Sequence, residues 1–226
     1  MGNFNEIVKI VTVYLIPVLF AISVHEAAHG YVARYFGDST ASDEGRLSLN
    51  PLRHIDPFGT IILPLLLYFT IKVPFGYFKP VPVDFSRLRN PKRHMVWVAA
   101  AGPAANLLMM LAWMIFLIVL TDKVPASRPQ AYLIEVSQAG VLVNAVMCVF
   151  NLIPVPPLDG GRIVTGLLPL SLSNKYGHLD RYTPFVFAAL ILLSYKGILG
   201  KFLSGVILVF IEGVYGLTLP LRALLS

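Results

Sequence analysis

Long apolar runs dominate the chain, and they predict membrane-spanning helices. Crossing the hydrocarbon layer of a bilayer takes about 20 mostly apolar residues. Four runs reach or approach that length: residues 7–36, 95–120, 132–154 and 202–221. A fifth run, 183–194, is too short alone but spans if it tilts or extends into its flanks. We therefore expect an all-α polytopic membrane protein with about five to six membrane segments.

The stretch between the first two spans has a different pattern. In residues 45–51 (GRLSLNP), alternating polar and apolar positions predict a short strand. Prolines in residues 79–83 (KPVPV) indicate edge strands or loops. Residues 61–69 are apolar but contain Pro64, which suggests a re-entrant or interfacial piece. We expect a small β-hairpin and re-entrant region here. GRLSLNP either offers an edge to a bound, unwound peptide or is a membrane-surface hairpin without such a contact.

The composition supports a lipid environment. The chain of 226 residues is 56% hydrophobic and only 13% charged, with a mean hydropathy of +0.72. Soluble domains carry roughly 25% charged residues. We expect one integral-membrane domain over residues 1–226, with a core at about 7–165 that contains the motifs described below and C-terminal spans at about 180–221. No separate soluble domain is expected, and the net charge of +6 suggests cytoplasmic loops rather than nucleic-acid binding.

The N-terminal apolar run is not expected to be a cleavable signal peptide. It begins near Ile7 and exceeds the length of a signal core. It also contains the chain's most distinctive polar motif, described below. The single cysteine, Cys148, lies in an apolar run, so we expect it to be a small buried side chain without a disulfide partner.

Basic residues predict the orientation. If the first span ends near Phe36 on the cytoplasmic side, and if residues 183–194 span, 13 of the 18 Lys and Arg residues are cytoplasmic. The other five are Lys9, Lys123, Arg128, Lys196 and Lys201. This bias matches the positive-inside rule. It also places the ends of the first and third spans on the same face of the membrane.

The first span carries a metal-binding pattern, His25-Glu26-Ala27-Ala28-His29. Positions i and i+4 share one face of a helix, so both imidazoles can bind one Zn²⁺. Glu26 is turned away from the metal and suits a general base. The alternative is a helix end emerging into water. About 22 Å separate Ile10 from His25, so the motif would lie about 8 Å inside the far boundary. Ionisable groups at such depth are usually functional.

A zinc hydrolase needs a third protein ligand, and Asp159 is the candidate. It ends the segment Asn151–Asp159 (NLIPVPPLD), whose prolines cannot continue the third span as a helix. Two glycines follow it and allow close backbone approach. The alternative is a helix N-cap at Asp159. The His-Glu motif and the shared membrane face favour the ligand.

Together these motifs resemble the site-2 protease family of intramembrane zinc metalloproteases, peptidase family M50. HEAAH in a span and NLIPVPPLDGG far downstream carry the resemblance, with GRLSLNP, GYFKPVPV and AAAGPAANL similar to compact bacterial members. The resemblance covers most of residues 20–165. This chain leaves no room for the PDZ, CBS or long luminal domains of many relatives, so regulation by such domains is not expected.

The resemblance implies hydrolysis of peptide bonds in or near transmembrane segments of membrane-protein substrates. It implies one zinc per chain at His25, His29 and Asp159, with Glu26 as base. Asn151 and Asn106 would contact the substrate backbone or the developing oxyanion; alternatively, Asn106 simply bonds a neighbouring helix. The expected location is a bacterial cytoplasmic membrane, with the active site toward the cytoplasm. The expected partners are substrate segments and lipid, not nucleic acid.

Two other functions use the same residues. A membrane metal-binding or transport protein would bind the ion without hydrolysis, although transport favours polar groups along a whole path and these cluster toward one face. A catalytically inactive relative would act only by binding. His54, His94 and His178 lack partners at ligand spacing and are expected to be structural or interfacial.

Overall fold

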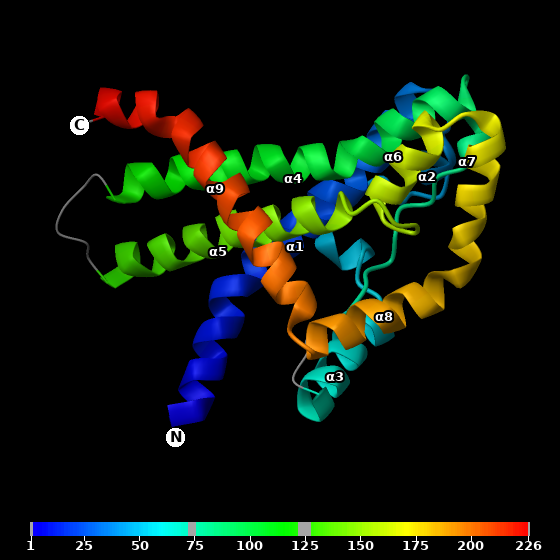
Figure 1. The fold of residues 1–226 in the computed structure, drawn as a ribbon. Helices are drawn as coiled ribbons and strands as arrows, with labels where there is room; N and C mark the ends of the chain where they lie inside the picture. The colour runs from blue at the N-terminus through cyan, green and yellow to red at the C-terminus, as the bar shows by residue number, and fades with distance from the viewer. Residues whose placement is uncertain (1, 72–75, 122–127, 226) are drawn as a thin grey trace.

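Four long apolar helices form the body of the protein in the computed structural model (Figure 1). The structure describes residues 2–71, 76–121 and 128–225. The long helices are α1 (Gly2–Tyr35), α4 (Pro91–Thr121), α5 (Arg128–Asn151) and α9 (Ile198–Leu225). Within the described residues, each contains a segment long and apolar enough to cross a membrane. The protein is therefore an integral membrane protein.

Shorter helices connect and flank the long ones. Those of α type are α2 (Thr40–Asp43), α3 (Leu63–Ile71), α6 (Asp159–Leu167), α7 (Leu170–Gly177) and α8 (Thr183–Tyr195). Pro57–Ile62 forms a π-helical turn, and 3₁₀ turns occupy Pro51–Arg53, Phe85–Arg87 and His178–Tyr182.

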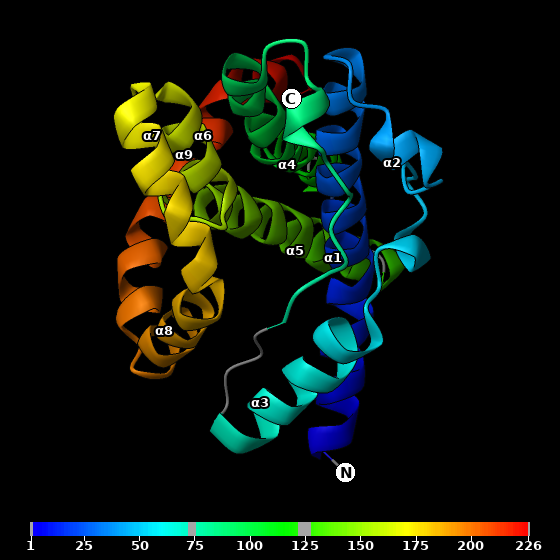
Figure 2. The ribbon, with the colours of Figure 1, turned by 90° about the vertical axis from the view of Figure 1, so that its right-hand side faces the viewer.

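The core lies between α4, α5 and α9. Met110 and Met114 of α4, Ala145 of α5, and Leu203 and Ile207 of α9 belong to one buried cluster. Figure 1 shows α9 crossing the α4–α5 pair diagonally. In the view turned by 90°, α1 rises beside α4 and α5, and α6 and α7 lie across from it (Figure 2).

The expected number of membrane segments needs correction. About five to six were expected, but among the described residues only the four long helices have the length and hydropathy to span. Helix α8 has 13 residues, or about 20 Å at 1.5 Å per residue, well short of a hydrocarbon layer of about 30 Å. The apolar stretch Pro57–Ile71 includes residues 61–69, which were expected to be re-entrant or interfacial, and it is too short to span.

The expected β-hairpin is wrong, because the described residues contain no strand. In the GRLSLNP segment, the amides of Arg46 and Leu47 both donate to the carbonyl of Ala41. Asn50 caps the following 3₁₀ turn by accepting from Leu52. Local turns thus use the backbone donors that a strand ladder needs. The alternation in RLSLN does not match burial either, because Leu47 is half-buried whereas Leu49 is exposed.

Residues 76–84 also run without regular structure, although in an extended path. The Tyr77 amide donates to the Gly59 carbonyl, and the Lys79 amide to the His54 carbonyl. Pro80 and Pro82 have no amide hydrogen, so no ladder can continue. We call residues 76–84 the cavity strap, because several of its residues line the cavity described below.

Candidate metal centre

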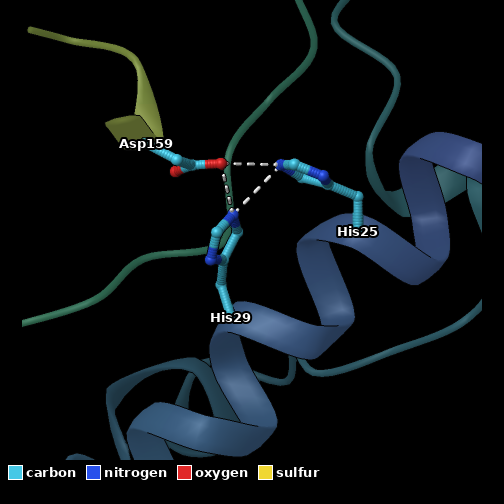
Figure 3. Close-up of side chains that lie close together, drawn as sticks. All are labelled: His25, His29 and Asp159. Carbon is cyan, nitrogen blue, oxygen red and sulfur yellow. Dashed lines mark hydrogen bonds and ion pairs between the residues drawn. The ribbon is translucent and has the colours of Figure 1, made fainter. Parts of the chain in front are cut away.

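Helix α1 presents His25 and His29 one turn apart, and the start of α6 brings Asp159 against them (Figure 3). The two Nε2 atoms are 3.1 Å apart. Asp159 Oδ2 lies 3.2 Å from Nε2 of His25 and 3.3 Å from Nε2 of His29. The three side chains are only 6–12% exposed. Sequence reasoning selected these three residues, and among the described His, Cys, Asp and Glu they alone form such a group.

The loop before Asp159 is held by close backbone packing. A Cβ at Gly160 would lie 2.3 Å from the Leu152 carbonyl oxygen, and one at Gly161 would lie 2.3 Å from the Pro156 nitrogen. The expected role of the two glycines is therefore confirmed. Helix α6 begins at Asp159 itself, and no side-chain hydrogen bond caps it. The carboxylate is turned toward the histidines, which argues against the N-cap interpretation.

Hydrogen bonds on the far side of each ring fix where the imidazole protons lie. Nδ1 of His29 is 2.7 Å from the Val98 carbonyl oxygen, which can only accept, so Nδ1 carries the hydrogen. Nδ1 of His25 is 2.6 Å from Asn106 Oδ1. In neutral rings with Nδ1–H, both Nε2 atoms point bare lone pairs toward Asp159. Oδ2 of Asp159 correspondingly has no hydrogen-bond donor among the described residues.

Three acceptors facing one another at 3.1–3.3 Å repel each other unless a cation lies between them. Zinc–ligand bonds of about 2.0–2.2 Å in a tetrahedron place neighbouring ligand atoms about 3.3–3.6 Å apart. The observed triangle is close to that spacing. Its donor set, two imidazoles and a carboxylate, is one that catalytic zinc sites use. These residues therefore fit a zinc ion.

Helix α4 leaves room behind the ligands. A Cβ at Gly102 would lie 2.4 Å from His29 Nε2 and 2.6 Å from His25 Nε2. The absence of a side chain at residue 102 is thus what allows both imidazoles to meet. Sequence reasoning noted AAAGPAANL as part of the resemblance but gave Gly102 no role.

Glu26 lines the same cavity as the triangle but is not part of it. Its Oε2 accepts a hydrogen bond of 2.7 Å from the Val81 amide of the cavity strap. The strap residue that holds this carboxylate was not found from sequence. Pro80 and Pro82 on either side of Val81 were a usable signal, because they leave it the one amide donor of the PVP triplet.

The cavity has a volume of about 720 Å³ and is lined mainly by apolar side chains of α1, α5 and the strap. His25, Glu26, His29 and Asp159 lie in its wall, and so does Asn151. Asn151 donates to the Met147 carbonyl of its own helix at 3.0 Å. Asn106 is fully buried behind His25 and is not among the lining residues.

The other three histidines lie in different environments. His54 is buried and its Nε2 is 2.8 Å from the Ser48 carbonyl oxygen. His94 stacks on Phe36, with ring centroids 4.0 Å apart. His178 begins a 3₁₀ turn. None belongs to the group of residues that could hold a metal.

Comparison with known proteins agrees with the geometry. The family model for peptidase family M50 matches residues 125–193. A Bacillus subtilis protein named "Putative zinc metalloprotease YwhC" is 36% identical over 179 residues, which cover 78% of each chain. The chain belongs to peptidase family M50.

More distant M50 relatives match less of their own length or at lower identity. Rip2 of Mycolicibacterium smegmatis, also named as a zinc metalloprotease, is 31% identical over 63% of this chain and 52% of its own. MJ0611 of Methanocaldococcus jannaschii, named likewise, is 28% identical over 72% of this chain and 73% of its own. No solved structure matches the chain.

Proposed function

We propose that this M50 protein is a zinc metalloprotease of the site-2 type, which hydrolyses peptide bonds in or near transmembrane segments of membrane proteins. The observation that carries the proposal is the convergence of His25, His29 and Asp159 beside Glu26 in an apolar cavity of a four-span protein. The names of the relatives support it.

His25, His29 and Asp159 would hold one zinc ion. When bound, zinc lowers the pKa of a coordinated water and polarises a carbonyl. The donors fit this role because Nδ1 of each ring is occupied by a hydrogen bond, which leaves Nε2 to bind the ion. Three protein ligands also leave a position for water, as catalytic zinc sites require.

Glu26 would act as general base and then as general acid. Its carboxylate takes a proton from the attacking water and passes it to the leaving amine nitrogen. The Val81 amide holds one carboxylate oxygen at 2.7 Å and so fixes the orientation of the group. The second oxygen is left for the water.

The cavity suits a locally unwound segment of a transmembrane helix. A helix hides its carbonyl groups in internal hydrogen bonds, so a substrate must open before attack. Asn151, in the cavity wall, would donate its amide to a substrate carbonyl or to the oxyanion. Asn106 lies behind His25, and we assign it a positioning role in place of the expected substrate contact.

The site would face the cytoplasm of a bacterial cell. Because α8 is too short to span, Lys196 and Lys201 are now assigned to the cytoplasmic side and Arg222 to the opposite side. The excess of basic residues on the cytoplasmic side persists. His25 and Asp159 lie near the end of α1 and just beyond the end of α5. Both ends are on the face that carries this excess.

The test is to measure metal content and proteolysis in the same preparations. Wild type, Glu26→Gln and Asp159→Ala are purified in detergent, assayed for zinc, and incubated with single-span model substrates. We expect about one zinc per chain in wild type and Glu26→Gln, less in Asp159→Ala, and cleavage by wild type alone. Glu26→Gln should lose at least ~10²-fold in rate.

Two results would overturn parts of the proposal. Wild-type rates from Glu26→Gln on a verified substrate would remove Glu26 as the base. Wild-type protein that takes up no zinc after metal reconstitution would remove the metal centre.

A further inference from the structure

Two fully buried amide side chains connect the metal centre with a helix that contributes no ligand. Asn106 of α4 and Asn144 of α5 are both 0% exposed. Asn106 Nδ2 donates to Asn144 Oδ1 at 3.0 Å and lies 3.3 Å from the Ala21 carbonyl oxygen of α1. Asn144 Nδ2 donates to the Gly140 carbonyl at 2.8 Å. A polar chain therefore runs from the α5 backbone to Nδ1 of His25.

The direction of every hydrogen bond in this chain is fixed by its far end. A backbone carbonyl can only accept, so the NH₂ group of Asn144 must face Gly140. Its oxygen then faces Asn106, which must present NH₂ to Asn144 and to the Ala21 carbonyl. The Asn106 oxygen is left facing His25, so Nδ1 of His25 must carry the hydrogen.

We propose that Asn144 is a positioning residue which, through Asn106, sets the tautomer and ring orientation of His25. The His25 Nε2 lone pair then points into the ligand triangle. This inference rests on the proposed metal centre for its purpose. The chain of contacts stands on burial and distances alone, within 2.6–3.3 Å at each link.

The competing explanation is that the two amides merely join helices, as polar residues in membrane proteins often do. The explanations differ in one respect. A serial chain requires that losing Asn144 acts on His25 only through Asn106. Helix joining predicts lost stability without a change in the His25 proton.

Nitrogen NMR of metal-free protein with ¹⁵N-labelled histidine measures that proton directly, using His25→Gln to assign the signal. We expect the Nδ1–H form for His25 in wild type. In Asn144→Ala we expect a mixture of tautomers, because Asn106 then keeps only its 3.3 Å contact with the Ala21 carbonyl, the longest link of the chain. Ser137→Ala is the matched control. Ser137 is also fully buried on α5, but among the described residues its hydroxyl bonds only to the Leu133 carbonyl of its own helix. An unchanged tautomer in Asn144→Ala overturns the proposal.

A rescue variant keeps the test decisive if Asn144→Ala folds poorly. A carboxylate at residue 106 can only accept, so it holds the His25 hydrogen at Nδ1 whatever side chain occupies position 144. We expect Asn106→Asp combined with Asn144→Ala to restore the wild-type His25 signal. A mixed tautomer in the double variant would contradict the assigned direction of the chain.

Zinc affinity, measured by competition with a chelator, gives a second readout. Loss of an outer partner of a metal ligand typically weakens binding by about 10–100-fold, and we expect this for Asn106→Ala and Asn144→Ala. Groups acting in series are not additive, so the double alanine variant should bind no more weakly than Asn106→Ala. Additive losses would overturn the serial relation. If wild type binds no zinc, the metal centre fails, while the NMR result still decides the relay.

Discussion

At the scale of single residues, Gly102 shows that the candidate metal centre depends on the absence of a side chain. It lies on α4, opposite the two histidines of α1. A methyl group there would overlap both imidazole rings at 2.4–2.6 Å. The rings are the free ends of flexible side chains, so they can rotate away at little cost to the rest of the fold. The damage would therefore be confined to the ligands.

We expect Gly102→Ala to fold and insert normally but to lose most of its zinc. Zinc per chain and the midpoint of thermal unfolding in detergent measure the two effects. Gly213→Ala is the control, because a Cβ at Gly213 has nothing within 4 Å. Full zinc occupancy in Gly102→Ala would contradict the role given to Gly102.

Residue types and spacing were enough to select the three side chains that the structure brings together, and the proposed base, but not the groups that support them. HEAAH and the downstream Asp159 are local patterns, readable because ionisable residues are costly in apolar spans. The Val98 carbonyl carries no sequence signal, since every residue has a backbone carbonyl, and the Val81 amide is marked only by its two flanking prolines. Asn144 did have a sequence signal, because it precedes Asn151 by two helical turns and lies on the same face of an apolar helix.

At the scale of elements, the junction between α5 and α6 decides where Asp159 lies. The loop over residues 152–158 folds back so closely that a Cβ at Gly161 would lie 2.3–2.7 Å from the backbone of Val155 and Pro156. Unlike the histidine rings, a backbone cannot rotate aside. A larger residue must displace either the loop or the first turn of α6.

We expect Gly161→Ala to lower the free energy of unfolding by about 1–3 kcal/mol, the usual range for overpacking, and to reduce zinc binding by moving Asp159. Denaturation in mixed detergent with and without chelator separates the two effects. Gly177→Ala is the comparison, because its Cβ would meet only Thr165 Cγ2 at an ordinary 3.6 Å. Wild-type stability and zinc in Gly161→Ala would count against close packing at this junction.

Elements were predictable where a pattern was long and less so where it was short. The four long spans lie where the apolar runs placed them, because about 20 apolar residues have few alternatives to a spanning helix. The five residues RLSLN gave a strand pattern, but the Ala41 carbonyl and the Asn50 side chain took the backbone donors into turns. Such competition from local turns for the backbone hydrogen bonds is not visible in alternation alone.

At the scale of the whole molecule, the orientation in the membrane can be tested by labelling introduced cysteines, without first replacing the native cysteine. The chain has one cysteine, Cys148, which is 3% exposed. It should therefore react slowly with maleimides. Lys9 and Lys175 are both exposed and lie on opposite predicted sides.

We expect Lys175→Cys to be protected from a membrane-impermeant maleimide in intact cells and labelled after permeabilisation. Lys9→Cys should be labelled in intact cells. The reverse pattern would place the metal centre on the outer side and refute the cytoplasmic assignment.

The ligands come from widely separated parts of the chain, and this sets the order of events during biosynthesis. His25 and His29 are synthesised early, whereas Asp159 follows only after two further spans. At 5–20 residues per second, the delay is roughly 6–26 s. During that interval the nascent chain lacks the third candidate ligand, so the proposed metal centre cannot form. If the protein is the proposed intramembrane protease, this order of synthesis postpones its activity until the bundle has closed.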